Sequence, residues 1–202
     1  MPPHDAIVLA AGGSRRLGRP KQLLTREGET LVRRAVRLVR ETRPRRLVVV
    51  CGAHAQDVAA AIDGLEAQIV CNPDWDNGLA GSLRVAVDAL ATPQVGCLIV
   101  ACDQPALQLD HLLHLLEAAS ASSSGCAATA HGARAGVPAM VSAALLWQAM
   151  NARGDRGLRD ALNNGVAGDV ARLHAPALAF DIDTPSDVAR AIDAGLLDRE
   201  VP

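Results

Sequence analysis

Residues 9–21 read Leu9-Ala-Ala-Gly-Gly-Ser-Arg-Arg-Leu-Gly-Arg-Pro-Lys21, a glycine- and arginine-rich segment that overlaps the end of the apolar run Asp5–Ala11. A glycine pair after a strand leaves backbone N–H groups free to face an anion, and the arginines add positive charge. Lys21 is the only lysine in the chain, and all the other basic residues are arginine. An ammonium group is compact and can follow a moving phosphate oxygen, whereas a guanidinium is a broad planar fork. The segment therefore predicts a phosphate-binding loop in which Lys21 has a special role.

The spacing of the loop glycines separates this segment from two familiar phosphate-binding motifs. The glycines at positions 12, 13 and 18 do not have the Gly-x-Gly-x-x-Gly spacing of a dinucleotide-binding loop. Gly13 and Gly18 have the spacing of a P-loop, but Arg19-Pro20 follows where that motif requires Lys-Ser/Thr. Pro20 lacks an N–H and fixes its own φ angle, so Lys21 belongs to a different loop geometry.

Length and composition bound the class of protein. A chain of 202 residues, half of them hydrophobic, is long enough for one domain (1–202) with a substantial core. No apolar run approaches the length that crosses a membrane, so we expect no membrane association. The N-terminal residues do not resemble a secretory signal, which leads us to expect a cytoplasmic protein. The five cysteines include no Cys-x-x-Cys pair and are expected to act as small hydrophobic residues rather than as zinc ligands or disulfides.

The charge of the chain is unevenly distributed. The formal net charge is −2, but residues 1–50 carry twelve basic and four acidic side chains, against eight and eighteen in the remainder. Part of the basic excess lies on a predicted helix, Thr30–Thr42, where Arg33, Arg37 and Arg40 lie opposite an apolar stripe and are expected to form a solvated face. An acidic chain with one Phe, two Trp and no Tyr also lacks the stacking residues of a single-strand binder. We therefore expect no nucleic-acid partner.

Apolar runs of strand length alternate with helical patterns along the chain. Such alternation predicts an α/β fold whose mainly parallel sheet is covered by helices on both faces. Helices are expected at Thr30–Thr42, Ala55–Leu65, Ser82–Leu90, Leu109–Ser120, Ala143–Met150, Leu158–Asn163 and Ser186–Ala194. Strands are expected at Asp5–Ala11, Arg46–Gly52, Gln68–Asn72, Gly96–Cys102, Cys126–Ala130, Val137–Val141 and Ala177–Ile182.

Chemically active residues follow several of these predicted strands. In open α/β sheets, ligands bind beyond the carboxyl ends of the strands. The glycine loop follows the first strand, Asn72 ends the third, Asp103 follows Cys102, and Asp183 follows the last predicted strand. We therefore expect these residues to gather at one edge of the sheet.

The glycine loop and further motifs resemble the nucleotidyltransferase family that includes the molybdenum cofactor guanylyltransferases and cytidylyltransferases. The resemblance covers nearly the whole chain, in the expected order. Leu9–Leu24 is similar to the signature loop, and its opening Leu-Ala-Ala-Gly looks more like the cytidylyl branch. The other matching motifs are the mid-chain helix start Gly78-Leu-Ala-Gly-Ser-Leu83, the metal-binding motif Cys102-Asp-Gln-Pro105 and the C-terminal motif Asp181-Ile-Asp-Thr-Pro185.

Three positions depart from the family pattern. Leu17 replaces the usual methionine, and Cys102 stands where glycine often precedes the aspartate. Arg134-Ala-Gly-Val-Pro138 follows the Gly-His-Pro element of the acceptor region only loosely, which leaves the identity of the acceptor open.

The resemblance implies a Rossmann-like three-layer α/β/α nucleotidyltransferase fold, with residues 1–105 binding the nucleotide and residues 106–202 binding the acceptor. It implies a Mg²⁺-dependent enzyme that transfers CMP from CTP to a molybdopterin-type phosphate and releases pyrophosphate. The alternatives are transfer from GTP or another nucleotide, transfer to a sugar or polyol phosphate, or a non-catalytic chaperone that inserts cofactor into a client molybdoenzyme.

The resemblance and the chemistry of nucleotidyl transfer suggest a role for each residue. Lys21, Arg16 and Asp103 are the predicted catalytic residues, since the reaction depends on positioning and charge neutralisation. Asp103 and Asp183 are the predicted Mg²⁺ ligands, and Asp181 could share or replace the role of Asp183. The predicted nucleotide-binding residues are Leu9, Ala10, Ala11, Gly12, Gly13, Ser14, Arg15, Arg16, Lys21, Asn72, Gly78 and Ser82.

Several of these residues also have structural interpretations. Asp103 could cap the turn before Pro105, and Asp183 could belong to the N-cap region of the last helix. Asn72, Gly78 and Ser82 are typical turn and helix-start residues. His131 and His174 are lone histidines that we expect on the surface or in the core.

Overall fold

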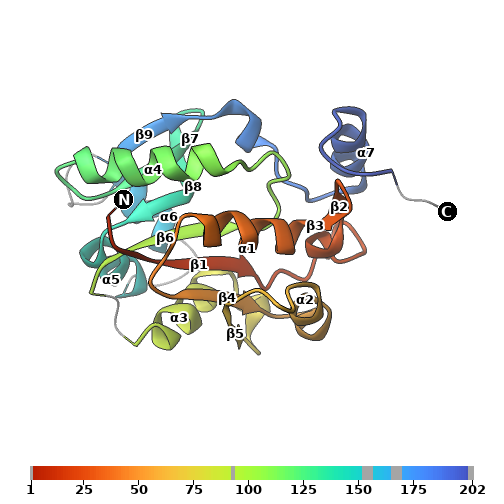
Figure 1. Ribbon diagram of the computed structural model, residues 1–202, viewed down its shortest axis with the longest axis horizontal. Coiled ribbons are helices and arrows are strands. Elements are labelled where there is room, and N and C mark those ends of the chain that lie inside the picture. The colour runs from red at the N-terminus through yellow and green to blue at the C-terminus, as the bar shows by residue number, and fades with distance from the viewer. Residues whose placement is uncertain (1, 92–93, 152–156, 165–169, 200–202) are drawn as a thin grey trace.

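The computed structural model describes residues 2–91, 94–151, 157–164 and 170–199. Its centre is a seven-stranded sheet with helices packed on both faces (Figure 1). In spatial order the strands are β5 (Gln68–Cys71), β4 (Leu47–Cys51), β1 (His4–Ala10), β6 (Gly96–Ala101), β8 (Arg134–Val141), β7 (Ala127–His131) and β9 (Ala171–His174). All pairings except those of β8 are parallel, so the prediction of a mainly parallel α/β sheet is confirmed.

The helices divide between two hydrophobic cores, one on each face of the sheet. Helices α1 (Leu31–Glu41), α2 (Ala55–Ala61) and α4 (Leu109–Ala121) contribute to one core. Helices α3 (Leu79–Ala89), α5 (Ala143–Asn151) and α6 (Gly157–Asn164) contribute to the other. Strand β1 is buried throughout because its residues alternate between the cores, Ala6 and Val8 on one side and Ile7 and Leu9 on the other. This double burial explains why the strand reads as a continuous apolar run.

The segment before the last helix differs from the prediction. Ala177–Ile182 was predicted as a strand, but the last strand is β9, and the 3₁₀ helix η3 (Pro176–Ala179) replaces the start of the predicted one. Pro176 has no N–H to donate to a sheet ladder, and the alanines that follow have little preference for strands. Beyond η3 the chain crosses towards β6, where the Ile182 N–H donates a hydrogen bond to the Asp103 carbonyl at 3.0 Å. Asp183 therefore follows an irregular crossing segment rather than a strand.

A third apolar cluster fastens the glycine loop to the C-terminal helix α7 (Pro185–Asp193). Leu17 of the loop and Ile182 belong to this cluster together with Val188 and Ala191 of α7. A small hairpin lies beside α7 (Figure 1) and consists of β2 (Thr25–Arg26) and β3 (Glu29–Thr30), which the sequence did not predict. The cluster explains how residues from opposite ends of the chain are brought to one place.

The arginine face of α1 is partly exposed to solvent, and its arginines also contact neighbouring segments. Arg37 forms ion pairs with Glu29 at 2.8 Å and Glu41 at 2.8 Å, and Arg40 pairs with Glu66. Arg33 donates hydrogen bonds to the carbonyls of Ala61 and Asp63. These arginines therefore bind neighbouring segments. The glutamates that pair with Arg37 and Arg40 neutralise part of the excess positive charge of residues 1–50.

Four of the five cysteines lie in the hydrophobic interior, as predicted for small hydrophobic residues. All five are free thiols, and four are buried, namely Cys51, Cys97, Cys102 and Cys126. Burial raises the pKa of Cys51 to about 11, so this thiol stays protonated at neutral pH. Cys71 is exposed, because it lies on β5 at the edge of the sheet.

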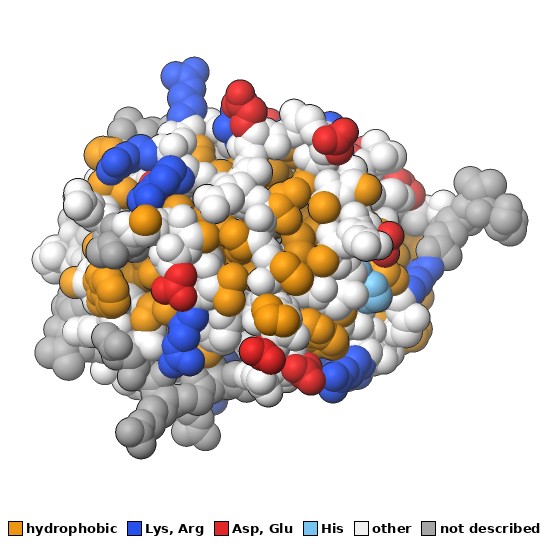
Figure 2. Space-filling model, turned by 90° about the horizontal axis from the view of Figure 1, so that it is seen from below, with side chains coloured by type: hydrophobic (Ala, Val, Ile, Leu, Met, Phe, Trp, Pro, Cys, Tyr) orange, Lys and Arg blue, Asp and Glu red, His pale blue; other side chains and the backbone are white. Residues whose placement is uncertain are grey.

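Figure 2 views the molecule from the side of β5 and α3, and hydrophobic side chains gather in the middle of that face. In the part of the chain described, no helix is long and apolar enough to span a membrane.

Candidate active site

A cavity of about 400 Å³, here called the loop cavity, lies where the parallel strands β1 and β6 end. Its walls are the glycine loop, the start of α3 and the turn after β6. Most of the predicted nucleotide-binding residues line this cavity, as does Asp103. They are Leu9, Ala10, Ala11, Gly12, Gly13, Ser14, Arg15, Lys21, Gly78 and Ser82.

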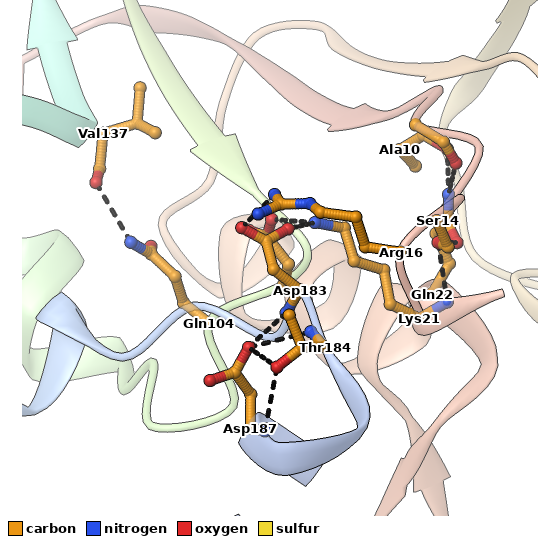
Figure 3. Close-up of polar contacts among 12 residues, drawn as sticks. Ala10, Ser14, Arg16, Lys21, Gln22, Gln104, Val137, Asp183, Thr184 and Asp187 are labelled. Atoms are coloured by element: carbon orange, nitrogen blue, oxygen red, sulfur yellow. Dashed lines mark hydrogen bonds and ion pairs between the residues drawn. The ribbon is translucent and has the colours of Figure 1, made fainter. Parts of the chain in front are cut away.

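Gln22, which sequence analysis did not identify as a site residue, holds the glycine loop in shape (Figure 3). Its buried amide nitrogen donates to the carbonyls of Ala10 at 3.0 Å and Gly12 at 2.6 Å. Ser14, with a φ of 50°, accepts a hydrogen bond on its hydroxyl from the Lys21 N–H at 3.0 Å. The loop is therefore closed on itself, and the start of the 3₁₀ helix η1 (Lys21–Leu23) is fixed beneath it.

Lys21 lies between the two predicted metal ligands. Its ammonium nitrogen Nζ is 2.6 Å from Asp103 Oδ2 and 3.0 Å from Asp183 Oδ1. Arg16 Nη2 contacts the other oxygen of Asp183 at 2.8 Å (Figure 3). The three predicted catalytic residues and the second predicted metal ligand thus form one charged network.

This network shifts the protonation equilibria of its members. Burial alone would lower the pKa of Lys21, but Asp103 and Asp183 outweigh it and raise the pKa above its ordinary value. Burial acts to raise the pKa of Asp183, but the hydrogen bond from Lys21 and the charge of Arg16 outweigh it and lower the pKa. Lys21 and Asp183 are therefore both charged at neutral pH.

The C-terminal motif positions Asp183 without using it as a helix cap. Thr184 is the N-cap of α7, Pro185 is its first residue, and Asp187 completes a capping box. The hydrogen bond from the Thr184 hydroxyl lowers the pKa of Asp187 to about 2. Because Asp187 also accepts from the Asp183 N–H, the backbone at Asp183 is fixed and its side chain is left for Lys21 and Arg16.

The carboxylates fit a hard divalent cation in part. Asp103 and Asp183 offer oxygen atoms on either side of one ammonium, and oxygen is the donor that Mg²⁺ and Mn²⁺ prefer. Among the described residues no group of three or more His, Cys, Asp or Glu side chains converges as a complete cage. The pair therefore suits a cation that also takes oxygen ligands from a bound triphosphate.

Two of the predicted nucleotide-binding residues lie outside the cavity wall. Asn72 is buried. Its side-chain nitrogen Nδ2 donates to the Ser82 hydroxyl at 3.0 Å, and its side-chain oxygen Oδ1 accepts from the Asp74 N–H. Its contacts are those of a residue that holds the start of α3. Arg16 points to Asp183 instead of lining the loop cavity.

Trp75 is a second residue that sequence analysis missed. It belongs to the 3₁₀ helix η2 (Trp75–Asn77), lines the loop cavity, and has the guanidinium of Arg15 5.2 Å from its ring centroid. A Cβ atom added at Gly13 would overlap the Trp75 ring. The glycine at position 13 is therefore required by a close approach of loop and indole.

Replacing Gly13 with alanine is expected to destabilise the protein by roughly 1–3 kcal/mol, because the Trp75 ring must move out of a packed position. The matched control is Gly12→Ala, since a Cβ at Gly12 meets no atom within 4 Å. Urea denaturation of both variants measures the difference. Equal stabilities for the two variants would show that the Trp75 contact does not constrain the loop.

A second cavity, of about 580 Å³, adjoins the loop cavity and is here called the far cavity. The two share Leu9, Leu79, Ala101 and Asp103. Asp181, the alternative metal ligand, lines the far cavity, and so does His131, whose ring nitrogen contacts the Val137 carbonyl at 2.9 Å. His174 lies on β9 and is exposed. Asp103 thus stands at the boundary between two spaces, each large enough for part of a substrate.

A glycine loop that faces Asp103 across a cavity suits nucleotidyl transfer, and the family match and full-length relative below show that the chain is a nucleotidyltransferase. Residues 6–171 match the MobA-like NTP transferase domain, so the chain belongs to that family.

Curated relatives have several different names, among them a nucleotidyltransferase and an oxidoreductase. The chain is 29% identical to the molybdenum cofactor cytidylyltransferase of Escherichia coli over 188 residues, which cover 93% of this chain and 94% of that one. It is 38% identical to the nicotine blue oxidoreductase of Paenarthrobacter nicotinovorans over 117 residues, and this match spans only 57% of either chain. The full-length similarity is therefore with a nucleotidyltransferase.

Solved structures agree with the fold. A nucleotidyl transferase from Methanothermobacter thermautotroptrophicus superposes with a TM-score of 0.79 at 28% identity, covering 95% of this chain and 97% of that one. A manganese complex of Rv0371c from Mycobacterium tuberculosis H37Rv superposes with a TM-score of 0.74 at 25% identity, covering 95% and 99% of the two chains.

Proposed function

We propose that this enzyme transfers CMP from CTP to the phosphate of a molybdopterin-type acceptor and releases pyrophosphate. The observation that carries the proposal is the position of the Lys21 ammonium, between Asp103 and Asp183 and beside the glycine loop. The full-length similarity to the E. coli cytidylyltransferase and the Leu-Ala-Ala-Gly opening of the loop support CTP as the donor.

The chain's own residues account for the charge changes in this reaction. An oxygen of the acceptor phosphate attacks the α-phosphorus of CTP, and the bond from that phosphorus to the bridging oxygen of pyrophosphate breaks. The attacking oxygen is already ionised, so no general base is required. Lys21 would neutralise charge that grows on the α-phosphate and the leaving group, and Arg16 would hold the outer phosphates.

We assign a divalent cation, Mg²⁺, to the carboxylates of Asp103 and Asp183. When bound, it would supply positive charge to the phosphate oxygens. Asp103 lies between the two cavities, which suits a ligand that faces both substrates. In this assignment residues 1–105 provide the nucleotide site and residues 106–202 provide most of the acceptor site.

A panel of nucleotides and acceptors tests the proposal through pyrophosphate release. We expect release with CTP, Mg²⁺ and molybdopterin, and little release with GTP or with a sugar or polyol phosphate as acceptor. Preferential use of GTP would overturn the assignment of CTP. Release of no pyrophosphate from any combination would favour a cofactor-insertion chaperone.

The oxidoreductase relative requires one further control in the same panel. The glycine loop lacks the dinucleotide-binding spacing, so we expect no oxidation of NADH or NADPH by the purified protein. Steady oxidation of either cofactor in the presence of an electron acceptor would contradict the proposed function.

A further inference from the structure

The connection from β6 to α4, residues 102–108, carries Asp103 and belongs to no helix or strand. It is here called the Asp103 connection. The Asp103 carbonyl accepts a hydrogen bond from the Ile182 N–H at 3.0 Å. The carbonyls of Pro105 and Leu107 accept hydrogen bonds from two arginine side chains that come from an earlier part of the chain. The position of Asp103 therefore depends on contacts of the backbone around it as well as on those of its own carboxylate.

The two arginines are Arg26 of the hairpin and Arg34 of α1. Arg26 Nη1 donates to the Pro105 carbonyl at 2.6 Å. Arg34 Nη2 donates to the Leu107 carbonyl at 3.1 Å and to the side-chain oxygen of Gln108 at 3.4 Å. Neither arginine lines the loop cavity or the far cavity. Both guanidinium groups therefore hold the Asp103 connection without reaching a space that a substrate could fill.

Stability does not explain why these positions carry arginine. Arg34 is buried, forms no ion pair with any described residue, and has a buried Nε without a hydrogen-bond partner in the described structure. Burial and the nearby charge of Arg26 both lower the pKa of Arg34. The Arg26 side chain is only 13% exposed, and its ion-pair partner, Glu27, is 73% exposed. Positive charge that is buried with so little compensation is unfavourable for folding.

Arg26 also connects Asp103 to Lys21. Arg26 lies five residues after Lys21, and Pro105 lies two residues after Asp103. The Arg26–Pro105 hydrogen bond and the Lys21–Asp103 ion pair, each 2.6 Å long, therefore close a ring through two short stretches of chain. Because the ring is small, a displacement of the hairpin changes the separation of the Lys21 ammonium and the Asp103 carboxylate.

The hairpin can serve as a support because it is anchored at two places. The carboxylate of Asp198 accepts from the N–H groups of Glu27 and Gly28 at 2.8 Å each. The Leu31 N–H, at the start of α1, donates to the Leu24 carbonyl at 2.8 Å. The hairpin and the start of α1 therefore form one anchored unit from which both arginines extend.

We propose that Arg26 and Arg34 are positioning residues that hold Asp103 in place beside Lys21 during nucleotidyl transfer. They act through the backbone of the Asp103 connection and touch neither the nucleotide nor the acceptor. Transfer depends on placement, and a displacement of about 1 Å can lower the rate by a factor of about 100. The inference deepens the proposed function, since it rests on the assignment of Asp103 as a metal ligand and catalytic residue.

Replacing each arginine with methionine removes the donor and the charge while keeping a long side chain. We expect Arg26→Met and Arg34→Met each to lower kcat for pyrophosphate release by about tenfold to a hundredfold. The KM for CTP should change little, because Gln22 holds the glycine loop separately. Binding of Mn²⁺ alone, measured by electron paramagnetic resonance, should weaken by about tenfold.

Arg33→Met is the matched control for these variants. Arg33 also lies on α1 and also donates to two backbone carbonyls, but these belong to Ala61 and Asp63, outside the Asp103 connection. Its replacement should leave kcat, the KM for CTP and the Mn²⁺ affinity close to their native values.

A double-mutant cycle separates positioning from a merely structural role. In the Asp103→Asn background no carboxylate remains to be placed, so adding Arg34→Met should lower kcat by no more than about twofold. A merely structural loss would lower kcat by the same factor in both backgrounds. Arg34→Lys keeps the charge and a donor, so its kcat should lie between those of the native protein and Arg34→Met. This variant also serves if Arg34→Met does not fold.

Two results would overturn the inference. One is native kcat and Mn²⁺ affinity in both methionine variants, and the other is an equal effect of Arg34→Met in the two backgrounds. Failure of the metal assignment would appear instead as unchanged Mn²⁺ affinity in Asp103→Asn itself. Absence of pyrophosphate release from the native protein would count against the proposed function, and the Mn²⁺ affinities of the arginine variants would still decide the inference.

Discussion

Replacing Lys21 with methionine is expected to lower kcat by a factor of about 10²–10³ and, at the same time, to tighten the binding of Mn²⁺ in the absence of nucleotide. The loss of turnover follows from removal of the positive charge at the phosphates. The gain in metal affinity follows from the native contacts, since the ammonium lies 2.6 Å from Asp103 and 3.0 Å from Asp183. A metal ion must displace this ammonium before it can bind both carboxylates.

Electron paramagnetic resonance of free Mn²⁺ measures the affinity, and pyrophosphate release measures turnover. Without nucleotide we expect Lys21→Met to bind Mn²⁺ on the order of tenfold more tightly, which corresponds to about 1.4 kcal/mol of removed repulsion. Lys21→Arg is the control, because it keeps the charge and should keep the weak metal binding while lowering kcat through its different shape. Weaker Mn²⁺ binding in Lys21→Met would contradict the position assigned to the metal.

Replacing Asp103 with asparagine is expected to lower kcat by on the order of 10³, with little change in thermal stability. The substitution keeps the shape of the side chain but removes a charge that faces both cavities and the Lys21 ammonium. Stability should change little because Lys21 keeps its ion pair with Asp183 when the charge of Asp103 is removed. Pyrophosphate release and thermal denaturation measure the two effects.

Comparison with two further substitutions identifies the second metal ligand. Asp183→Asn should impair metal-dependent turnover nearly as strongly as Asp103→Asn, because Asp183 contacts the same ammonium. Asp181→Asn should have a smaller effect, since Asp181 lines the far cavity and makes no ion pair among the described residues. A larger loss of turnover in Asp181→Asn than in Asp183→Asn would make Asp181 the second metal ligand. Near-native turnover in Asp103→Asn would show that Asp103 is not part of the active site.

Much of the fold could be predicted because buried parallel strands leave a clear pattern. Strand β1 is buried on both faces and reads as an uninterrupted apolar run, as does β4. The segment before α7 was mispredicted because its apolar residues serve another purpose. Leu178 packs into the core from a 3₁₀ turn, and Ile182 packs into the cluster beneath the glycine loop. A short apolar run does not tell a strand from such a crossing segment.

The site could be predicted where charge and motif coincide, as at Lys21, Asp103 and Asp183. Gln22 and Trp75 were missed because their roles depend on tertiary contacts. Gln22 acts through a buried amide that holds two loop carbonyls, and Trp75 acts through a ring packed on Gly13. A glutamine directly after the loop lysine was a usable signal, because a polar side chain in an apolar setting must find hydrogen bonds.

Strand β8 is the one reversed strand of the described sheet and joins β6, which precedes Asp103, to β7 and β9. It pairs with β6 on one side and β7 on the other, so the glycine loop after β1 and the part of the far cavity wall formed by β8 belong to one hydrogen-bonded sheet. An enzyme built on two hinged lobes brings its substrates together by closing. Under the proposed function, the distance between donor and acceptor would be set when the chain folds, and side chains such as Lys21 would make the remaining adjustment. Selection for a longer or shorter acceptor would therefore act on the walls of the cavities and not on a hinge.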